Sequence, residues 1–231
     1  MDEPGPSEQS DQPGPTEYLD QPGPTEYLDQ IVGVGPHPPP WPTGDRFDQA
    51  LLADGDRRNV ADRYRYWTVE AIVADLDAHR HEFAVAIENW RHDMNIGTIV
   101  RTANAFLARE VIIVGRRRWN RRGAMVTDRY QHIRHVADPA ELAAYAQSAG
   151  YELIGVDNLP GSQPLERADL PRNVLLLFGQ EGPGLTDEAR AVVTRTCSIA
   201  QYGSTRSINA GVAAGIAMHA WIRAHAQPSS H

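Results

Sequence analysis

The sequence contains no lysine, only one cysteine and no long hydrophobic run, and each absence excludes a class of protein. All 22 basic residues are arginine. This excludes a Walker A phosphate loop and any enzyme that forms a Schiff base, because both need a lysine side chain. Cys197 alone can form neither a disulfide within the chain nor a cysteine zinc cluster. We therefore expect a protein of the reducing cytoplasm.

The apolar stretches are short and the histidines are scattered. The acidic N-terminus lacks the apolar core of a signal peptide. The longest weakly polar stretch, residues 208–222, is too short to cross a bilayer, so we expect no membrane segment. His132 and His135 could ligate a metal together, but no third ligand has a matching placement. We expect no metal site.

The net charge of −8 is unevenly distributed along the chain. Residues 1–62 hold 13 acidic residues and 3 arginines, whereas residues 63–231 hold 17 acidic residues and 19 arginines. The balance is −10 in the first part and +2 in the second. The acidity therefore belongs to the N-terminal part, and the remainder can still bind a polyanion.

The N-terminal part is also low in complexity. Residues 11–19 recur as residues 20–28, a nonapeptide rich in Pro, Gly and Glu that cannot bury enough apolar area to offset chain entropy. We expect residues 1–45 to form a disordered leader and residues 46–80 a short helical extension. Residues 81–227 then form the main domain.

Apolar runs and helical periodicities alternate in that domain. The patterns predict strands at 83–87, 111–114, 152–156, 174–178 and 195–199, and helices at 69–79, 95–107, 139–148 and from 207 to about 223. Strands and helices that alternate at crossover lengths predict an α/β fold. We expect a mainly parallel sheet with helices on both faces.

Residues 174–216 organise the chain. They include a glycine-rich loop at residues 179–185, Gly-Gln-Glu-Gly-Pro-Gly-Leu, which follows the apolar run 174–178. Glycine permits positive φ and a close approach of the backbone to a ligand. The spacing G-x-x-G-x-G is not the dinucleotide-binding fingerprint. Taken alone, the loop is as consistent with a plain turn as with a cofactor site.

Three blocks together are more specific. The blocks are Asn95-Ile-Gly-Thr-Ile-Val-Arg101, Phe178-Gly-Gln-Glu-Gly-Pro-Gly-Leu185 and, after Ile199 and Gly203, Ser207-Ile-Asn209-Ala-Gly-Val-Ala. In order and spacing they resemble the three motifs of the SPOUT superfamily, in its TrmH-like (SpoU) branch, over about residues 83–224. The chain departs from the third motif at Ala200, usually proline, at Gln201, commonly methionine, and at Ile208, usually leucine.

The resemblance implies a fold, an activity and an assembly. The implied fold is the SPOUT α/β-knot fold with a C-terminal trefoil knot. The implied enzyme transfers a methyl group from S-adenosyl-L-methionine to a ribose 2′-hydroxyl of tRNA or rRNA. It also implies a homodimer through the C-terminal helix region, where Ile208, Val212, Ile216 and His219 follow one another along one helix face.

The resemblance also assigns roles to residues. The catalytic candidates are Asn95, Arg101, Glu181, Ser207 and Asn209, and the candidates for cofactor binding are Gly179, Gly182, Ile199, Gln201 and Ile208. The family proposal makes Arg101 a base, but a guanidinium is effectively always protonated, which favours an electrostatic role. Glu181 can orient Arg101 or accept a proton. Ser207 and Asn209 equally fit a helix cap and its second helical position.

An arginine run supplies the expected RNA contacts. It comprises Arg116, Arg117, Arg118, Trp119, Arg121 and Arg122, in which the tryptophan could stack on a base. Two other functions stay open: a non-catalytic knotted RNA-binding or ribosome-assembly module, and a small-molecule α/β enzyme. The short segment before the first strand leaves little room for a separate RNA-binding domain, which slightly favours tRNA over rRNA.

Overall fold

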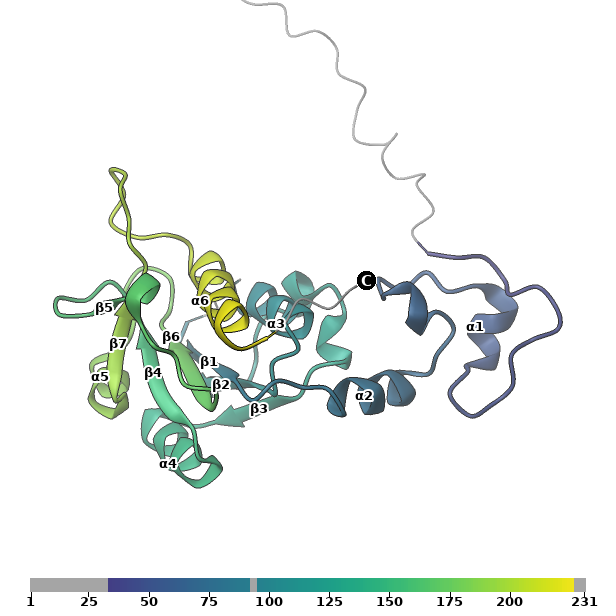
Figure 1. The fold of residues 1–231 in the computed structure, drawn as a ribbon, viewed down its shortest axis with the longest axis horizontal. Coiled ribbons are helices and arrows are strands. Elements are labelled where there is room, and N and C mark those ends of the chain that lie inside the picture. The colour runs from purple at the N-terminus through teal and green to yellow at the C-terminus, as the bar shows by residue number, and fades with distance from the viewer. Residues whose placement is uncertain (1–32, 92–94, 227–231) are drawn as a thin grey trace, which may run out of the picture. The chain divides into compact units, whose positions relative to one another are not determined.

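The structure is a computed structural model that describes residues 33–91 and 95–226. The chain forms two compact units, which divide between Tyr66 and Trp67 rather than at the expected residue 80. Figure 1 shows the helices and strands of both. The nonapeptide repeat lies outside the described residues.

The first unit is organised around one buried carboxylate. Its elements are the helix α1 (Gln49–Asp54) and the 3₁₀ helix η2 (Asp62–Tyr64). Asp56 is fully buried and accepts hydrogen bonds from the backbone and guanidinium of Arg58 and from the backbone N–H of Tyr66. Burial alone would raise the pKa of Asp56, but these hydrogen bonds outweigh it and lower the pKa to about 2.

Asp56 also ties in the segment that precedes α1. Val34 and Asp56 form an antiparallel bridge with both hydrogen bonds at 2.9 Å, and the Tyr66 hydroxyl donates to the carbonyl of Gly35 at 2.7 Å. The expectation of a disordered leader up to residue 45 is therefore wrong for residues 33–45. The sequence pattern does not predict this pairing, because a helix separates Val34 from Asp56 and turn residues surround each of them.

The second unit contains a seven-stranded sheet in the order β3-β2-β1-β6-β4-β7-β5. All neighbouring strands in it are parallel. The strands are β1 (Ala84–Asn89), β2 (Val111–Gly115), β3 (Ile133–Val136), β4 (Glu152–Val156), β5 (Gln163–Pro164), β6 (Val174–Phe178) and β7 (Arg195–Ser198). The predicted α/β class with a mainly parallel sheet is confirmed.

Helices cover both faces of this sheet, as Figure 1 shows. The helices of this unit are α2 (Val69–Asp77), α3 (Asn95–Ala105), α4 (Pro139–Ala149), α5 (Asp187–Val192) and α6 (Ala210–His225), with 3₁₀ helices η3 (Arg121–Ala124), η4 (Thr127–Arg129) and η5 (Leu165–Arg167). In β1, Val85 and Ile87 pack in a cluster with α3 and α6, whereas Ala84 and Ala86 pack in a cluster with α4 and α5. Successive side chains of a strand point to opposite faces, so apolar runs were needed to bury both.

The last helix is anchored at its C-terminal end. Trp221 is fully buried, its ring centroid lies 4.6 Å from that of Phe83, and its indole N–H donates to the carbonyls of Pro171 at 3.0 Å and Arg172 at 3.2 Å. A tryptophan buried with its N–H satisfied contributes large apolar area without an unmet donor. α6 is therefore fixed to the sheet near residue 221, and its first turn lies beside the candidate site.

Among the described residues, none of the helices combines the length and the apolar character that crossing a bilayer requires.

Candidate active site

The glycine loop begins where the central strand β6 ends. Gln180 and Gly184 exchange two backbone hydrogen bonds, of 3.2 and 3.1 Å, which close the loop. A Cβ atom on Gly179 would lie 2.0 Å from the carbonyl carbon of Gly184, and Gly184 itself has φ of +72°. A side chain at residue 179 would collide with the backbone, and one at residue 184 would strain it. Glycine is therefore required at both ends of the turn.

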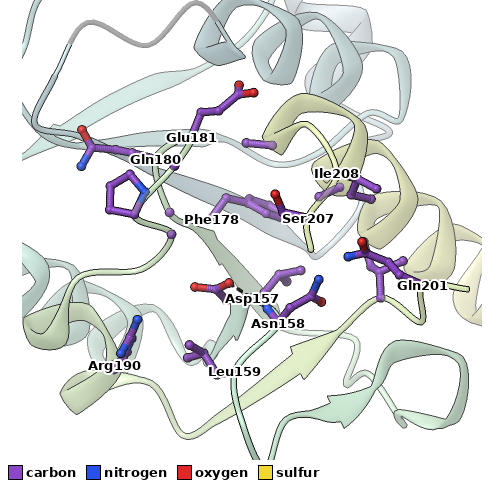
Figure 2. Close-up of a pocket in the computed structure, with 18 residues that line it drawn as sticks. Asp157, Asn158, Leu159, Phe178, Gln180, Glu181, Arg190, Gln201, Ser207 and Ile208 are labelled. Atoms are coloured by element: carbon purple, nitrogen blue, oxygen red, sulfur yellow. Dashed lines mark hydrogen bonds between the residues drawn. The ribbon is translucent and has the colours of Figure 1, made fainter. Parts of the chain in front are cut away.

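This loop forms one wall of a pocket beyond the carboxyl ends of β4, β6 and β7, shown in Figure 2. The cavity measures about 170 Å³, several times the ~30 Å³ that one water occupies in the liquid. All five residues expected to bind the cofactor line it: Gly179, Gly182, Ile199, Gln201 and Ile208. Ligands of open α/β sheets bind at this edge, so the pocket lies where a cofactor is expected.

The pocket also contains side chains that the motifs did not indicate. Asp157, Asn158 and Leu159 line it from the end of β4. The Asp157 carboxylate accepts hydrogen bonds from the backbone N–H groups of Leu185 at 2.9 Å and of Asn158 at 2.7 Å, so it holds the end of the glycine loop in place. These residues directly follow the predicted strand 152–156. The rule that ligands bind beyond the carboxyl ends of parallel strands could have found them.

Three side chains, one from each sequence motif, meet beside the pocket. The amide nitrogen of Asn95 donates to Oε2 of Glu181. The amide nitrogen of Asn209 donates to the same Glu181 oxygen at 3.0 Å and to Oδ1 of Asn95 at 2.8 Å. We call Asn95, Glu181 and Asn209 the polar triad. It connects the start of α3, the glycine loop and the start of α6, three segments that are remote in sequence.

The start of α6 differs from one interpretation of the sequence. Asn209, not Ser207, is the N-terminal cap, because its Oδ1 accepts from the backbone N–H groups of Gly211 at 2.9 Å and Val212 at 3.2 Å. Asn209 therefore combines capping with membership of the polar triad. Ser207 lies in the preceding loop, where it is exposed and lines the pocket.

Arg101 is separate from the polar triad. It lies on the exposed side of α3 and makes no ion pair or side-chain hydrogen bond with the residues that the structure describes. The expected orientation of Arg101 by Glu181 is therefore not seen, since that carboxylate binds Asn95 and Asn209. A guanidinium without a partner of its own can bind an incoming anion.

Buried polar groups at the end of β1 support the glycine loop from behind. Glu88 is fully buried and accepts from the Thr186 backbone N–H at 2.9 Å, the Thr186 hydroxyl at 2.6 Å and the Trp90 indole N–H at 2.8 Å. Oε1 of Gln180 accepts from the backbone N–H groups of Trp90 at 3.2 Å and Arg91 at 2.7 Å. The ends of β1 and β6 are therefore joined into one support.

The arginine run follows β2 at the same edge of the sheet. Its arginines are all exposed: Arg116, Arg117, Arg118, Arg121 and Arg122. The buried side chain of Asn89 donates to the carbonyls of Arg116 at 2.6 Å and Arg118 at 2.9 Å. These bonds hold the backbone of the arginine run to the end of β1. Trp119 is half-buried and packs against the core, with the Arg121 guanidinium 5.7 Å from its ring. Its expected stacking on a base therefore has only part of the ring available.

The arginines of the second unit divide into two groups. Near the carboxyl ends of the strands, several make no ion pair or side-chain hydrogen bond within the described part of the chain: Arg91, Arg101, Arg116, Arg117, Arg118, Arg122 and Arg206. Near the amino ends, arginines pair with acids: Arg80 with Asp77, Arg134 with Glu110, Arg172 with Glu82 and Arg195 with Glu152. The division is not complete, because Arg190, which lines the pocket, pairs with Asp187, and Arg109, which precedes β2, makes no ion pair in the described residues.

Two sequence features have structural explanations. His132 Nε2 pairs with Asp77 at 2.8 Å, whereas His135 Nε2 contacts the carbonyl of Gly115, so the two rings serve different partners. They flank Ile133 and Arg134 in the edge strand β3, which the sequence did not predict because it has no apolar run.

Cys197 is buried, and burial raises the pKa of its thiol, which keeps this thiol protonated.

Comparison with known proteins points to one family. The sequence model of the SpoU rRNA Methylase family matches residues 82–219. A relative from Mycolicibacterium smegmatis, an uncharacterized tRNA/rRNA methyltransferase, is 32% identical over 141 residues, which are 58% of this chain and 44% of that protein. The tRNA (guanosine(18)-2'-O)-methyltransferase of Escherichia coli is 24% identical over 153 residues, 64% of this chain and 67% of that protein.

A solved structure agrees with the fold. The AdoMet-bound rRNA methyltransferase from Sinorhizobium meliloti superimposes with a TM-score of 0.57 at 27% sequence identity, over 66% of this chain and 60% of that one. The chain spans less than half the length of the mycobacterial relative that it matches.

Proposed function

Because the chain belongs to the SpoU rRNA Methylase family, we propose that it transfers a methyl group from S-adenosyl-L-methionine to a ribose 2′-hydroxyl of tRNA or rRNA. The observation that carries this proposal is the polar triad, in which side chains from all three motifs converge next to the pocket. A protein that only binds RNA has no need to hold an amide–carboxylate–amide network at the edge of such a pocket.

The pocket residues fit the cofactor on two observations. A Cβ built on Gly182, where φ is +94°, meets no heavy atom within 4 Å, so this part of the loop leaves open space for a ligand. The side-chain amide of Gln201 is buried and has no hydrogen-bond partner in the described residues. Gly179, Ile199 and Ile208 would hold the cofactor against the loop. When bound, S-adenosyl-L-methionine supplies an activated methyl group on its sulfonium.

The protein's own groups then orient the ribose, stabilise the negative charge that develops on its oxygen, and accept the hydroxyl proton. Arg101, which is exposed and without an acidic partner in the described chain, would bind a phosphate of the reacting nucleotide and stabilise the developing alkoxide. A guanidinium cannot take the hydroxyl proton. Glu181 is the carboxylate that belongs to both the pocket and the polar triad, so we assign it the proton.

The charge distribution supports an RNA substrate. Several exposed arginines near the pocket have no acidic partner in the described residues, whereas four arginines at the opposite edge are paired with acids. Phosphate binding by such arginines releases counterions, so affinity for RNA should fall steeply as salt rises. The Asn89 hydrogen bonds to the carbonyls of Arg116 and Arg118 would keep these two side chains turned towards the substrate.

The proposal includes a homodimer, a trefoil knot and a cytoplasmic location. Support for the dimer comes from α6, where Val212 is 54% and Ile216 40% exposed on one helix face. Support for the knot comes from the family and from the central position of β6, between β1 and β4. Pulling the two ends of one molecule in an optical trap would test the knot, because a knotted chain stays shorter than its contour length. RNA processing in the cytoplasm fits the single, buried thiol.

The function is tested by methyl transfer from labelled S-adenosyl-L-methionine to separated tRNA and rRNA pools from cells that lack this protein. Label in one pool supports the proposal and names the substrate class. Binding of RNA without label would support the non-catalytic alternative, and transfer to neither pool would contradict the proposal.

A further inference from the structure

The side-chain amide of Gln201 is an unusual part of the pocket wall. Both polar atoms of its side chain, Oε1 and Nε2, are shielded from solvent and have no hydrogen-bond partner among the described residues. Most buried side-chain polar groups in proteins do have one, and an exception calls for an explanation. The residue lines the pocket, and Figure 2 shows its side chain reaching in from the loop that precedes α6. A ligand in the pocket can therefore supply the hydrogen-bond partners that this amide lacks.

The chemistry of an amide narrows the kind of ligand group. A glutamine side chain offers an acceptor and a donor side by side in one plane and carries no charge. Its complement is a planar edge on which a donor adjoins an acceptor. Adenine has such an edge, where the 6-amino group lies next to a ring nitrogen acceptor, and glutamine recognises it in this way on nucleic acids.

The surroundings of Gln201 favour a flat ring over the other parts of a cofactor. Ile199 and Ile208, both partly buried, line the same wall and offer apolar surface to a ring. Glu181 and Arg190 are both well away from Gln201 in Figure 2. The third charged side chain of the pocket, Asp157, already accepts hydrogen bonds from the backbone N–H groups of Leu185 and Asn158. A charged or hydroxyl-bearing part of a ligand fits those groups better than a neutral amide between isoleucines.

We infer that the side-chain amide of Gln201 binds the 6-amino edge of the cofactor's adenine, so that this side chain selects the purine. The inference rests on the proposed function, since it takes S-adenosyl-L-methionine as the ligand of this pocket. It goes further in giving the base selectivity to one side chain rather than to the loop backbone alone. Methionine, which the resembled motif commonly has at this position, could not donate to a ring nitrogen.

The test measures binding by calorimetry and needs no turnover. The two ligands are S-adenosylhomocysteine and its purine counterpart, in which hydrogen replaces the 6-amino group. The proteins are the full chain and Gln201→Met, with Gln201→Leu as an independent second variant. The full chain should bind the adenine compound at least about tenfold more tightly than the purine compound, because one buried hydrogen bond is worth about that factor.

In both variants this preference should shrink by about tenfold, through weaker binding of the adenine compound. Their melting temperatures without ligand should equal or exceed that of the full chain, because an unpartnered buried amide has been removed. Tyr202→Ala is the matched control: Tyr202 adjoins Gln201, but it is 97% exposed and does not line the pocket. It should leave the preference unchanged.

The outcomes separate this inference from the function on which it rests. A preference for the adenine compound that is equal in the full chain and both variants would overturn the role of Gln201, as would equal weakening of both ligands. Failure of the full chain to bind either ligand would instead count against the proposed function.

Discussion

Asn209 donates a hydrogen bond from its side-chain amide to the side-chain oxygen of Asn95 at 2.8 Å, although 114 positions separate the two residues. The Asn209 side-chain oxygen meanwhile caps α6, through the backbone N–H groups of Gly211 and Val212. One residue thus starts the last helix and joins the third motif to the first. Asparagine suits both tasks, because its amide carries a donor and an acceptor on separate atoms.

These two tasks of Asn209 can be separated by substitution. Serine caps helices about as well as asparagine, so Asn209→Ser should keep the stability of the protein, whereas Asn209→Ala should lose about 1 kcal/mol. Neither variant can bridge Asn95 and Glu181, so both should lose methyl transfer by about tenfold or more, as misplacement at a reacting centre does. Urea unfolding and a methylation assay on the same preparations give both readouts. Near-normal turnover in Asn209→Ser would show that the bridge has no part in the reaction.

Arg101→Ala should separate cofactor binding from chemistry. Arg101 is exposed on α3 and does not line the pocket, so the variant should fold and bind S-adenosylhomocysteine normally. Loss of a positioned charge at the reacting centre should lower methyl transfer by about a hundredfold. Arg109→Ala is the control, since Arg109 is also exposed but precedes β2, at the opposite edge of the sheet. Similar turnover in the two variants would remove Arg101 from the mechanism.

The exposed face of α6 predicts how the dimer can be broken. Ile216→Glu places a charge in the stripe that includes Val212, and burial of an unpaired charge in an interface is costly. We expect a monomer in analytical ultracentrifugation, with activity lost in parallel. Ala140→Glu is the control, because Ala140 is exposed on α4, which covers the other face of the sheet. A wild-type protein that is monomeric and fully active would contradict this part of the account.

Sequence reasoning was most successful where burial dictates the residues. The bounds of β4 and β6 match the predicted runs 152–156 and 174–178, because strands buried on both faces must be continuously apolar. The edge strand β3 went unpredicted, since an edge strand exposed on one side can carry Arg134 and His135. The pairing of Val34 with Asp56 was missed for a different reason: backbone bridges leave no periodic signal.

The site was predictable to the extent that motifs mark it. All five cofactor candidates line one pocket, and three of the five catalytic candidates form the polar triad. Spacing could not reveal that Glu181 binds two asparagines rather than Arg101, because side-chain partners across remote segments depend on the tertiary fold. Nor could it reveal Glu88, whose buried carboxylate supports the loop through Thr186.

The first unit should become less stable in acid, because Asp56 is then protonated. The pKa of Asp56 is about 2 in the folded unit, against an ordinary value of 3.8, so its carboxylate stabilises the fold fully above about pH 4. As the pH falls towards 2, about 2 kcal/mol of this stabilisation is lost.

Amide hydrogen exchange across this pH range measures that loss. The exchange of the Val34 and Tyr66 amides, corrected for the intrinsic pH dependence, should rise between pH 4 and pH 2. In Asp56→Asn, which cannot ionise, these amides should be less protected at pH 5 and their protection should no longer depend on this titration. A wild-type protection that stays constant down to pH 2 would contradict the assigned role of Asp56.

Nucleoside analysis of the methylated product tests directly whether the protein methylates ribose 2′-hydroxyls of RNA with the help of the polar triad. RNA labelled by the wild-type protein and by Asn209→Ser is digested to nucleosides, and mass spectrometry locates the added methyl group on ribose or on base. We expect one 2′-O-methylribonucleoside with the wild-type protein and at least about tenfold less of it with Asn209→Ser. A methyl group on the base, or equal product from both proteins, would contradict this expectation.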